Sequence, residues 1–143
     1  MVLLRDELAF TEQYLGLEAI RLGERLQLDW QVDEAALGVA LPSLTVQPLV
    51  ENSIKHAFNP RSQPGRLRVK VQRVTDCLHI EVADDGPGTT PQADGSLAPV
   101  DGLGLPTAAR RIALQYGPAA TFTIDTAPGA GFAVRIQLPV TTP

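Results

Sequence analysis

The sequence is poor in several kinds of residue, and each scarcity excludes a class of protein. It has a single cysteine, Cys77, which excludes an internal disulfide and a zinc site built from several cysteines. Its 12 lysines and arginines are outnumbered by 16 aspartates and glutamates, so nucleic acid is a poor default partner. No apolar run approaches the roughly 20 residues of a membrane-spanning helix. What remains is the composition of an ordinary soluble globular protein.

The 143 residues are enough for one domain with a core, and spacing divides them into elements. Residues 3–22 are expected to form a helix with two adjacent apolar stripes, which together would pack on two neighbours. The first stripe runs through Leu4, Leu8, Thr11, Leu15 and Leu22, and the second through Leu3, Phe10, Tyr14 and Leu17. A strand is expected from residue 26, and further helices at 45–57 and 106–116. Cys77 is expected to be a small buried apolar residue.

Two alternating runs at 66–71 and 78–82 fit a hairpin. A tight turn at 75–76 produces three cross-strand pairs: Val71 with Ile80, Val69 with Val82, and Lys70 with Glu81. A last hairpin follows at 122–138. This order of elements predicts the α+β class, as a two-layer α/β sandwich with a mixed, mostly antiparallel sheet and helices on one face. The expected buried set is Val46, Leu49, Val50, Ile54, Val69, Val71, Ile80, Val82, Ile112, Val134 and Ile136.

The helix at 45–57 has one apolar and one polar face. Thr45 is its predicted N-cap, and Pro48 falls in the first turn, where a missing N–H costs nothing. Glu51, Asn52 and Lys55 share the polar face, with His56 at its edge. A carboxylate, an amide oxygen and an ammonium on one turn suit a magnesium–phosphate ligand. An amphipathic surface helix with an exposed Glu/Lys pair explains the same pattern.

Glycines and an aspartate punctuate the chain after the first hairpin. Asp84 ends a strand, where its carboxylate is expected on the side opposite Val82 or in the loop mouth. There it could accept a hydrogen bond from an exocyclic amine such as that of adenine, or simply cap a turn. Gly86, Gly88, Gly102 and Gly104 bracket an irregular segment at 89–101, which is expected to be mobile without ligand. Gly102-Leu103-Gly104 before a helix can also seat an anion.

Three short motifs together resemble the N, G1 and G2 boxes of sensor histidine kinases. They are Glu51-Asn52-x-x-Lys55-His56, Asp84-Asp85-Gly86-Pro87-Gly88 and Gly102-Leu103-Gly104-Leu105. The leader 4–21 and the block 44–52 look like the LytS/YehU branch. The resemblance covers essentially the whole chain. It implies a Bergerat-type ATP-binding fold in the superfamily of gyrase, the heat-shock chaperone, histidine kinases and MutL.

The resemblance also implies ligands and roles. ATP and magnesium would be bound, with Asn52 on the metal, Lys55 on phosphate and Glu51 orienting water or the incoming nucleophile. Asp84 would accept from the adenine amine, beside Gly86 and Gly88. Residues 89–101 would be the ATP lid, and the phosphates would lie near Gly102, Leu103, Gly104, Leu105 and Thr107. His56 would lie near the ribose and phosphates, or would be a surface histidine at the end of the helix.

The sequence departs from the family pattern in three respects. Thr107 stands where the family usually has asparagine, and Phe132 where it usually has threonine. The phosphoacceptor histidine has no counterpart, because the only histidines are His56 and His79, and His79 is expected to face outward on a strand.

The expected protein is therefore a catalytic domain separated from its phosphoacceptor. Residues 1–25 would be a leader helix from an upstream dimerisation region, and 26–143 the ATPase domain. The partners would be ATP, that dimerisation domain and, indirectly, a response regulator. The location would be cytoplasmic, with a possible upstream membrane anchor in the full-length protein. A regulatory module like the anti-sigma serine kinases and a degenerate non-binding domain are the alternatives.

Overall fold

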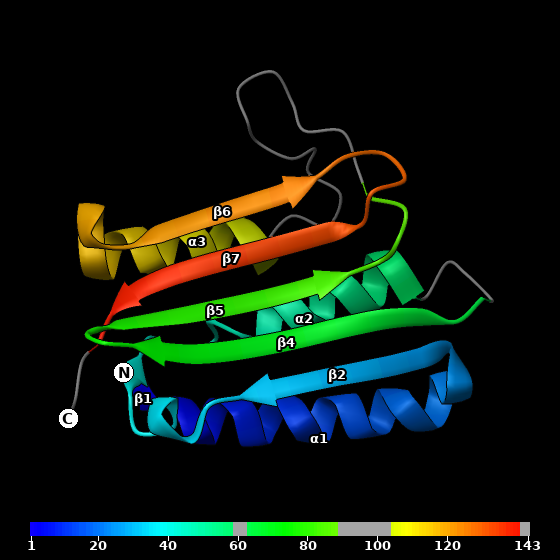
Figure 1. Cartoon of the computed structure of the whole chain (residues 1–143), viewed down its shortest axis with the longest axis horizontal. Helices are drawn as coiled ribbons and strands as arrows, with labels where there is room; N and C mark the ends of the chain where they lie inside the picture. The colour runs from blue at the N-terminus through cyan, green and yellow to red at the C-terminus, as the bar shows by residue number, and fades with distance from the viewer. Residues whose placement is uncertain (59–62, 89–103, 141–143) are drawn as a thin grey trace.

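The computed structural model describes residues 1–58, 63–88 and 104–140, and it has the two expected layers (Figure 1). One layer is a five-stranded sheet in the order β2 (Leu26–Val32), β4 (Gly65–Val74), β5 (Cys77–Asp84), β7 (Phe132–Pro139) and β6 (Thr121–Thr126). β2 runs parallel to β4, and the other neighbours are antiparallel. The predicted mixed, mostly antiparallel sheet is confirmed.

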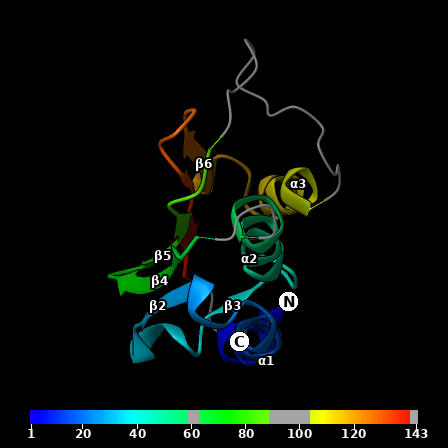
Figure 2. The same cartoon turned by 90° about the vertical axis from the view of Figure 1, so that its right-hand side faces the viewer.

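Helices make up the second layer, and they cover one face of the sheet (Figure 2). They are α1 (Leu4–Leu22), α2 (Gln47–Ser53) and α3 (Gly104–Tyr116). β1 (Val2–Leu3) pairs with β3 (Ala40–Leu41) and ties the start of α1 to the segment before α2. One π-helical turn extends α2 over Ile54–Phe58, and short 3-10 turns lie at Gly23–Arg25, Glu34–Ala36 and Gly117–Ala119.

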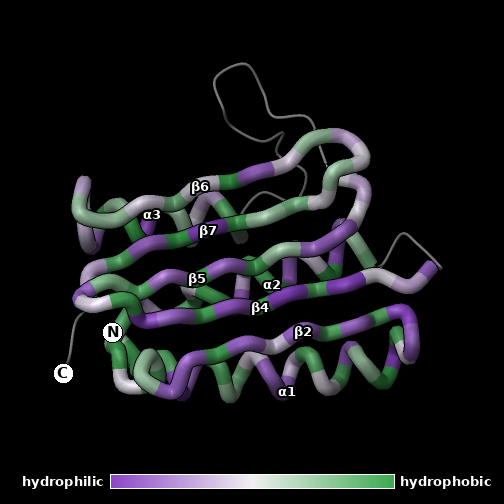
Figure 3. The backbone as a smooth tube through the Cα atoms, in the orientation of Figure 1, coloured by the Kyte–Doolittle hydropathy of each residue, from purple (hydrophilic) through white to green (hydrophobic). Residues whose placement is uncertain are grey.

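Alternation along the strands decides which side chains reach the core. Figure 3 shows apolar and polar residues alternating along the strands of the sheet. The register of β4 with β5 is the predicted one, including the pairs Val71↔Ile80, Val69↔Val82 and Lys70↔Glu81. Thr75 makes the turn with a positive φ of 57°. Every residue of the predicted buried set is buried: Val46, Leu49, Val50, Ile54, Val69, Val71, Ile80, Val82, Ile112, Val134 and Ile136.

The two stripes of α1 behave differently. Leu4, Leu8, Thr11, Leu15 and Leu22 are all buried, as expected. In the second stripe Phe10 is 63% exposed and Leu17 70% exposed, so the prediction that both stripes pack on neighbours is wrong. The reason is position, because among the described helices α1 lies at the end of the layer, with α2 as its one neighbour (Figure 2). Cys77 is half-buried rather than buried.

Candidate functional site

The start of α2 is capped by a side chain from a distant part of the sequence. Thr45 does not cap the helix, because its hydroxyl donates to the Pro42 carbonyl oxygen at 2.6 Å. The buried carboxylate of Glu7, on α1, instead accepts from the backbone N–H of Thr45 at 3.0 Å and from that of Val46. The prediction of a Thr45 cap is therefore wrong, and the cap comes from 38 residues away. Pro48 does lie in the first turn, as predicted.

The polar face of α2 continues into a π-helical turn. Ser53 ends the α-helix, and Ile54–Phe58 follow with π geometry, so the prediction of one regular helix over 45–57 is wrong in this detail. Glu51 and Lys55 are exposed, and Asn52 and His56 are half-buried. A π turn widens the helix by about one residue per turn, and such turns are frequent at functional sites. The residues expected to bind a ligand therefore span the junction of the two geometries.

The loop that follows β5 lies directly against this π turn. A Cβ atom added at Gly86 would lie 2.5 Å from the Cβ of Ala57 and 3.0 Å from its Cα. Both distances are shorter than side chains tolerate, so only glycine allows the loop to approach so closely. The contact brings the Asp84–Gly88 loop beside the segment that carries Asn52 and Lys55.

The β6–β7 turn holds the same loop from its other side. Gly88 has a φ of 66°, and a Cβ there would overlap the Ala127 carbonyl oxygen and lie 2.7 Å from that of Gly131. The Pro87 carbonyl oxygen accepts from the Gly129 N–H at 2.7 Å. The loop is thus held between a helix and a hairpin, in a conformation that Gly88 permits.

Asp84 lies on the helix-covered side of the sheet. It pairs with Leu67 on β4, which is fully buried, and directly paired residues share a face. The expected placement on the side opposite Val82 is wrong, because residues two apart on a strand point the same way. Asp84 Oδ1 accepts from the Gly86 N–H at 2.9 Å, so the carboxylate stabilises the turn. A carboxylate has about four lone-pair sites, so this bond is compatible with accepting from a ligand as well.

Only part of the third motif lies within the described residues. Gly102, Leu103 and the segment 89–101, including its expected mobility, lie outside the described residues. Gly104 begins α3, Leu105 is buried in the core, and Thr107 is exposed. α3 lies beside α2 (Figure 2), and Arg111 Nη1 donates to the Ser43 carbonyl oxygen at 2.9 Å. Any contact of Leu105 with a ligand would therefore involve its backbone.

Electrostatic interactions connect the polar face of α2 to α1. Gln47 Nε2 donates to Glu51 Oε1 at 3.1 Å. Burial, and then the carboxylates of Glu18 and Glu51, raise the pKa of Tyr14 on α1 to about 12. Glu51 thus accepts from a buried amide, and its charge acts on Tyr14. Both Gln47 and Tyr14 lie in the stretches 44–52 and 4–21 that carry the resemblance, but the sequence alone assigned neither residue a role.

Other features bear on alternative functions. His79 lies half-buried on β5, with Nδ1 3.3 Å from Gln137 Nε2 on β7, across the sheet from the α2 site. Within residues 1–58, 63–88 and 104–140, no three histidine, cysteine, aspartate or glutamate side chains gather as a metal site. None of the helices in the described part of the chain is long and apolar enough to cross a membrane.

Comparison with known proteins identifies relatives over nearly the whole chain. A family model described as "Histidine kinase-, DNA gyrase B-, and HSP90-like ATPase" matches residues 40–142. Sensor protein LytS of Enterococcus faecalis is 33% identical over 142 residues, which cover 94% of this chain and 24% of LytS. Sensor histidine kinase YesM of Bacillus subtilis is 29% identical over 142 residues, which cover 97% of this chain and 24% of YesM. The chain thus spans about a quarter of the length of these relatives.

Solved structures agree on the fold. The catalytic domain of histidine kinase ThkA superposes with a TM-score of 0.74 at 14% identity, over 96% of this chain and 92% of that domain. The histidine kinase domain of a blue-light activated kinase from Erythrobacter litoralis gives 0.68 at 20% identity, over 97% of this chain and 62% of that one. At such identities the likeness concerns the fold alone. With the family model, this fold confirms the resemblance drawn from the three motifs. The relatives, which are named sensor kinases, favour the sensor-kinase interpretation over a regulatory module.

Proposed function

The chain belongs to the family of histidine kinase-, DNA gyrase B- and HSP90-like ATPases, and on that premise we propose that it is the ATP-binding catalytic domain of a two-component sensor histidine kinase. It would transfer the γ-phosphate of ATP to a histidine on a dimerisation domain outside these 143 residues. A response regulator would then receive the phosphoryl group, in the cytoplasm. Residues 1–25 would lead from the dimerisation region into the ATPase domain at 26–143.

The contact between Gly86 and Ala57 is the observation that supports this proposal most. It places the Asp84 carboxylate and the polar face of the α2 segment at the same end of the molecule. Asp84 would accept a hydrogen bond from the adenine amine, while Gly86 and Gly88 leave room for the base. Guanine offers a carbonyl oxygen where adenine offers an amine, so the site would bind ATP more tightly than GTP.

The side chains on the helix suit a magnesium-bound triphosphate. Magnesium prefers oxygen ligands and usually keeps one or two from the protein, with phosphates and water completing the shell. The amide oxygen of Asn52 would match that role. Lys55 and His56 would contact phosphate or ribose. Gly102, Leu103, Gly104, Leu105 and Thr107 would provide the remaining phosphate contacts.

The catalytic side chains would act mainly by positioning. Bound magnesium would neutralise charge developing on the phosphates. Lys55 would hold the phosphates in place, and Glu51 would orient the incoming nucleophile. Neither histidine of the chain can serve as the acceptor. His56 belongs to the nucleotide-binding segment itself, and His79 lies on β5 between the buried Leu78 and Ile80.

Radiolabelled ATP tests the proposal. Incubated alone with magnesium and labelled ATP, the chain should take up essentially no acid-labile phosphate. Mixed with the dimerisation region of the full-length kinase, it should label that region slowly, because no tether raises the effective concentration. Asn52→Ala should abolish the transfer, whereas Gln115→Ala, on the exposed surface of α3, should not change it. Strong self-labelling would contradict the acceptor assignment, and ATP binding without transfer would favour a regulatory module.

A further inference from the structure

A short chain of hydrogen bonds links α1 to the carboxylate of Glu51. Thr11 Oγ1 lies 2.8 Å from Gln47 Oε1, and Gln47 Nε2 lies 3.1 Å from Glu51 Oε1. Thr11 is 0% exposed and Gln47 is 4% exposed, so both groups lie between α1 and α2 away from water. Of these three residues only Glu51, the last in this series of hydrogen bonds, is exposed at the surface.

Chemistry fixes the direction of these bonds. A carboxylate only accepts, so the amide nitrogen of Gln47 must face Glu51 and the amide oxygen must face Thr11. The Thr11 hydroxyl then has to donate to that oxygen, although the Glu7 carbonyl oxygen also lies within reach at 3.0 Å. The opposite orientation of the amide would bring two acceptors together at Glu51. A buried amide satisfied at both ends therefore has one stable orientation.

Neighbouring turns of α1 contact the same part of the molecule. One turn before Thr11, Glu7 fixes the start of α2 through the N–H groups of Thr45 and Val46. One turn after it, the pKa of Tyr14 is raised by burial and by the carboxylates of Glu18 and Glu51. Three successive turns of α1 thus interact with the segment from Thr45 to Glu51. The position of α1 is therefore coupled to the side chains around Glu51.

We propose that Thr11 is a positioning residue for Glu51. Its hydroxyl holds the Gln47 amide in one orientation, and the amide holds the Glu51 carboxylate where it can act on the incoming nucleophile. This proposal rests on the proposed function, in which Glu51 orients that nucleophile. A small shift of α1 that breaks the 2.8 Å contact would release Gln47 and then Glu51, so movement of α1 would change the rate of transfer.

Two substitutions at Thr11 separate the hydroxyl from the shape of the side chain. Thr11→Val keeps the shape and removes the hydroxyl, and Thr11→Ser keeps the hydroxyl. The rate of transfer from saturating magnesium–ATP to the dimerisation region should fall by about 5- to 50-fold in Thr11→Val. This loss is smaller than the ~100-fold that misplacing a catalytic group by about 1 Å can cost. ATP affinity, measured by calorimetry, should stay within a factor of two of the wild type, because Thr11 does not touch the nucleotide. Thr11→Ser should keep most of the wild-type rate.

A double-mutant cycle shows whether Thr11 acts through Gln47. Gln47→Met keeps the length of the side chain but makes neither hydrogen bond. Thr11→Val should lower the rate in the wild-type background and have no further effect in the Gln47→Met background. Circular dichroism and urea unfolding check that each variant is folded. If Thr11→Val destabilises the fold, the other two variants still test the proposal. Thr11→Ser should keep most of the wild-type transfer rate, and Gln47→Met should lower it.

The outcomes separate this proposal from the proposed function. A wild-type chain that binds no ATP or transfers no phosphoryl group contradicts the proposed function, and the positioning role of Thr11 with it. Normal wild-type transfer with equal rates for Thr11→Val and Thr11→Ser overturns the positioning role alone. Additive effects of Thr11→Val and Gln47→Met also overturn it, because they would show that the two residues act independently.

Discussion

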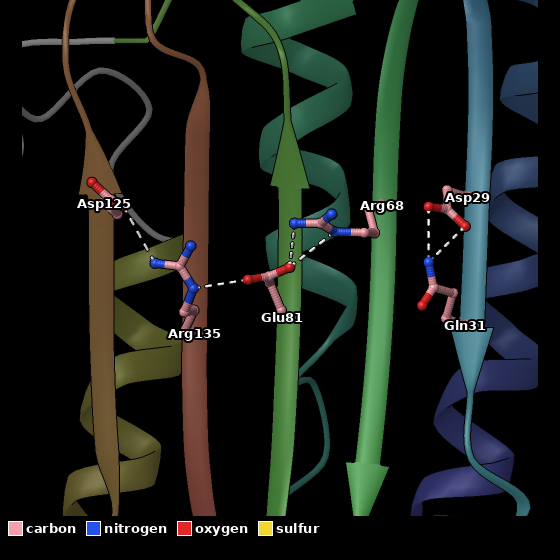
Figure 4. A network of polar contacts seen from close by, with 6 residues as sticks. All are labelled: Asp29, Gln31, Arg68, Glu81, Asp125 and Arg135. Carbon is pink, nitrogen blue, oxygen red and sulfur yellow. Dashed lines mark hydrogen bonds and ion pairs between the residues drawn. The ribbon is translucent and has the colours of Figure 1, made fainter.

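Two polar networks of opposite kinds lie on opposite sides of the sheet, one on its open face and one between the helices that cover the other face. On the open face, Glu81 on β5 bonds to Arg68 on β4 at 2.7 Å and to Arg135 on β7 at 2.8 Å, and Arg135 reaches Asp125 on β6 at 3.4 Å (Figure 4). On the covered side, Glu7, Thr11, Gln47 and Glu51 connect two helices, and the first three are buried. One network joins strands on the open face, where its arginine side chains are 43% and 48% exposed and Glu81 is half-buried, and the other fills a helix interface.

The difference lies in what each network can contribute. Exposed ion pairs contribute little, because water and salt screen them and long side chains lose entropy in forming them. Buried donors and acceptors are costly to leave unpaired, so each bond of the covered network is needed. We therefore expect substitutions on the covered side to change stability and function strongly, and those on the open face to change them slightly.

The largest effect is expected at Glu7. Glu7→Ala should lower the free energy of unfolding by about 2–4 kcal/mol, because two buried backbone N–H groups at the start of α2 lose their acceptor. Glu7→Gln keeps one acceptor oxygen and should fall in between. The exposed neighbour Asp6 is the matched control, and Asp6→Ala should change the unfolding energy by less than about 0.5 kcal/mol. Urea unfolding measures all three, and equal effects at Glu7 and Asp6 would contradict this view of the covered network.

Asp84 should affect binding more than stability. Asp84→Ala should weaken ATP binding by roughly 10- to 150-fold, the effect of losing a hydrogen bond to a charged acceptor. Asp85→Ala is the control and should leave the affinity for ATP nearly unchanged. Asp85 is exposed, and its Oδ1 accepts from the Arg66 N–H at 2.9 Å. Calorimetric titration with magnesium–ATP gives both affinities. Unchanged affinity in Asp84→Ala would remove Asp84 from the nucleotide site.

Alkaline pH should weaken the covered side through Tyr14. The folded-state pKa of Tyr14 is about 12 against an ordinary 10.0, because of burial and the nearby Glu18 and Glu51. Its contribution to stability is therefore complete below pH 10 and is lost as pH rises toward 12. The wild type should lose more stability than Tyr14→Phe over that range. Parallel pH profiles of the two proteins in urea unfolding would contradict the assignment.

The smallest effect is expected on the open face at Glu81. Burial alone would raise the pKa of Glu81, but the hydrogen bond from Arg135 and the charge of Arg68 outweigh it and lower the pKa below 4.5. The contribution of Glu81 is therefore present above pH 4.5 and is lost as pH falls through the lower folded-state value. Glu81→Gln should cost less than about 1 kcal/mol at neutral pH and should flatten the acid limb of the stability profile. A loss as large as that of Glu7→Ala would erase the contrast between the faces.

Local patterns predicted the strands and the register of β4 with β5, because period-2 alternation and a tight turn at Thr75 determine that register. The same period should also have placed Asp84 on the side of Val82. The Glu7 cap and the Thr11–Gln47 bond were beyond local reasoning, since they join residues 36 to 39 positions apart. The exposure of Phe10 depends on the absence of a neighbour beyond α1 in the described structure. The π turn at Ile54–Phe58 contains no proline or glycine, so the sequence gives no local signal that predicts it.

We claim that an adenine nucleotide binds where the Asp84–Gly88 loop meets the α2 segment. A calorimetric titration of the wild-type chain with ATP and with GTP, each with magnesium, distinguishes this site from one that does not select the base. We expect saturable binding of ATP and an affinity for GTP lower by at least about 10-fold, because guanine presents an acceptor to the Asp84 carboxylate. Equal affinity for the two nucleotides, or no binding of ATP, would contradict the claim.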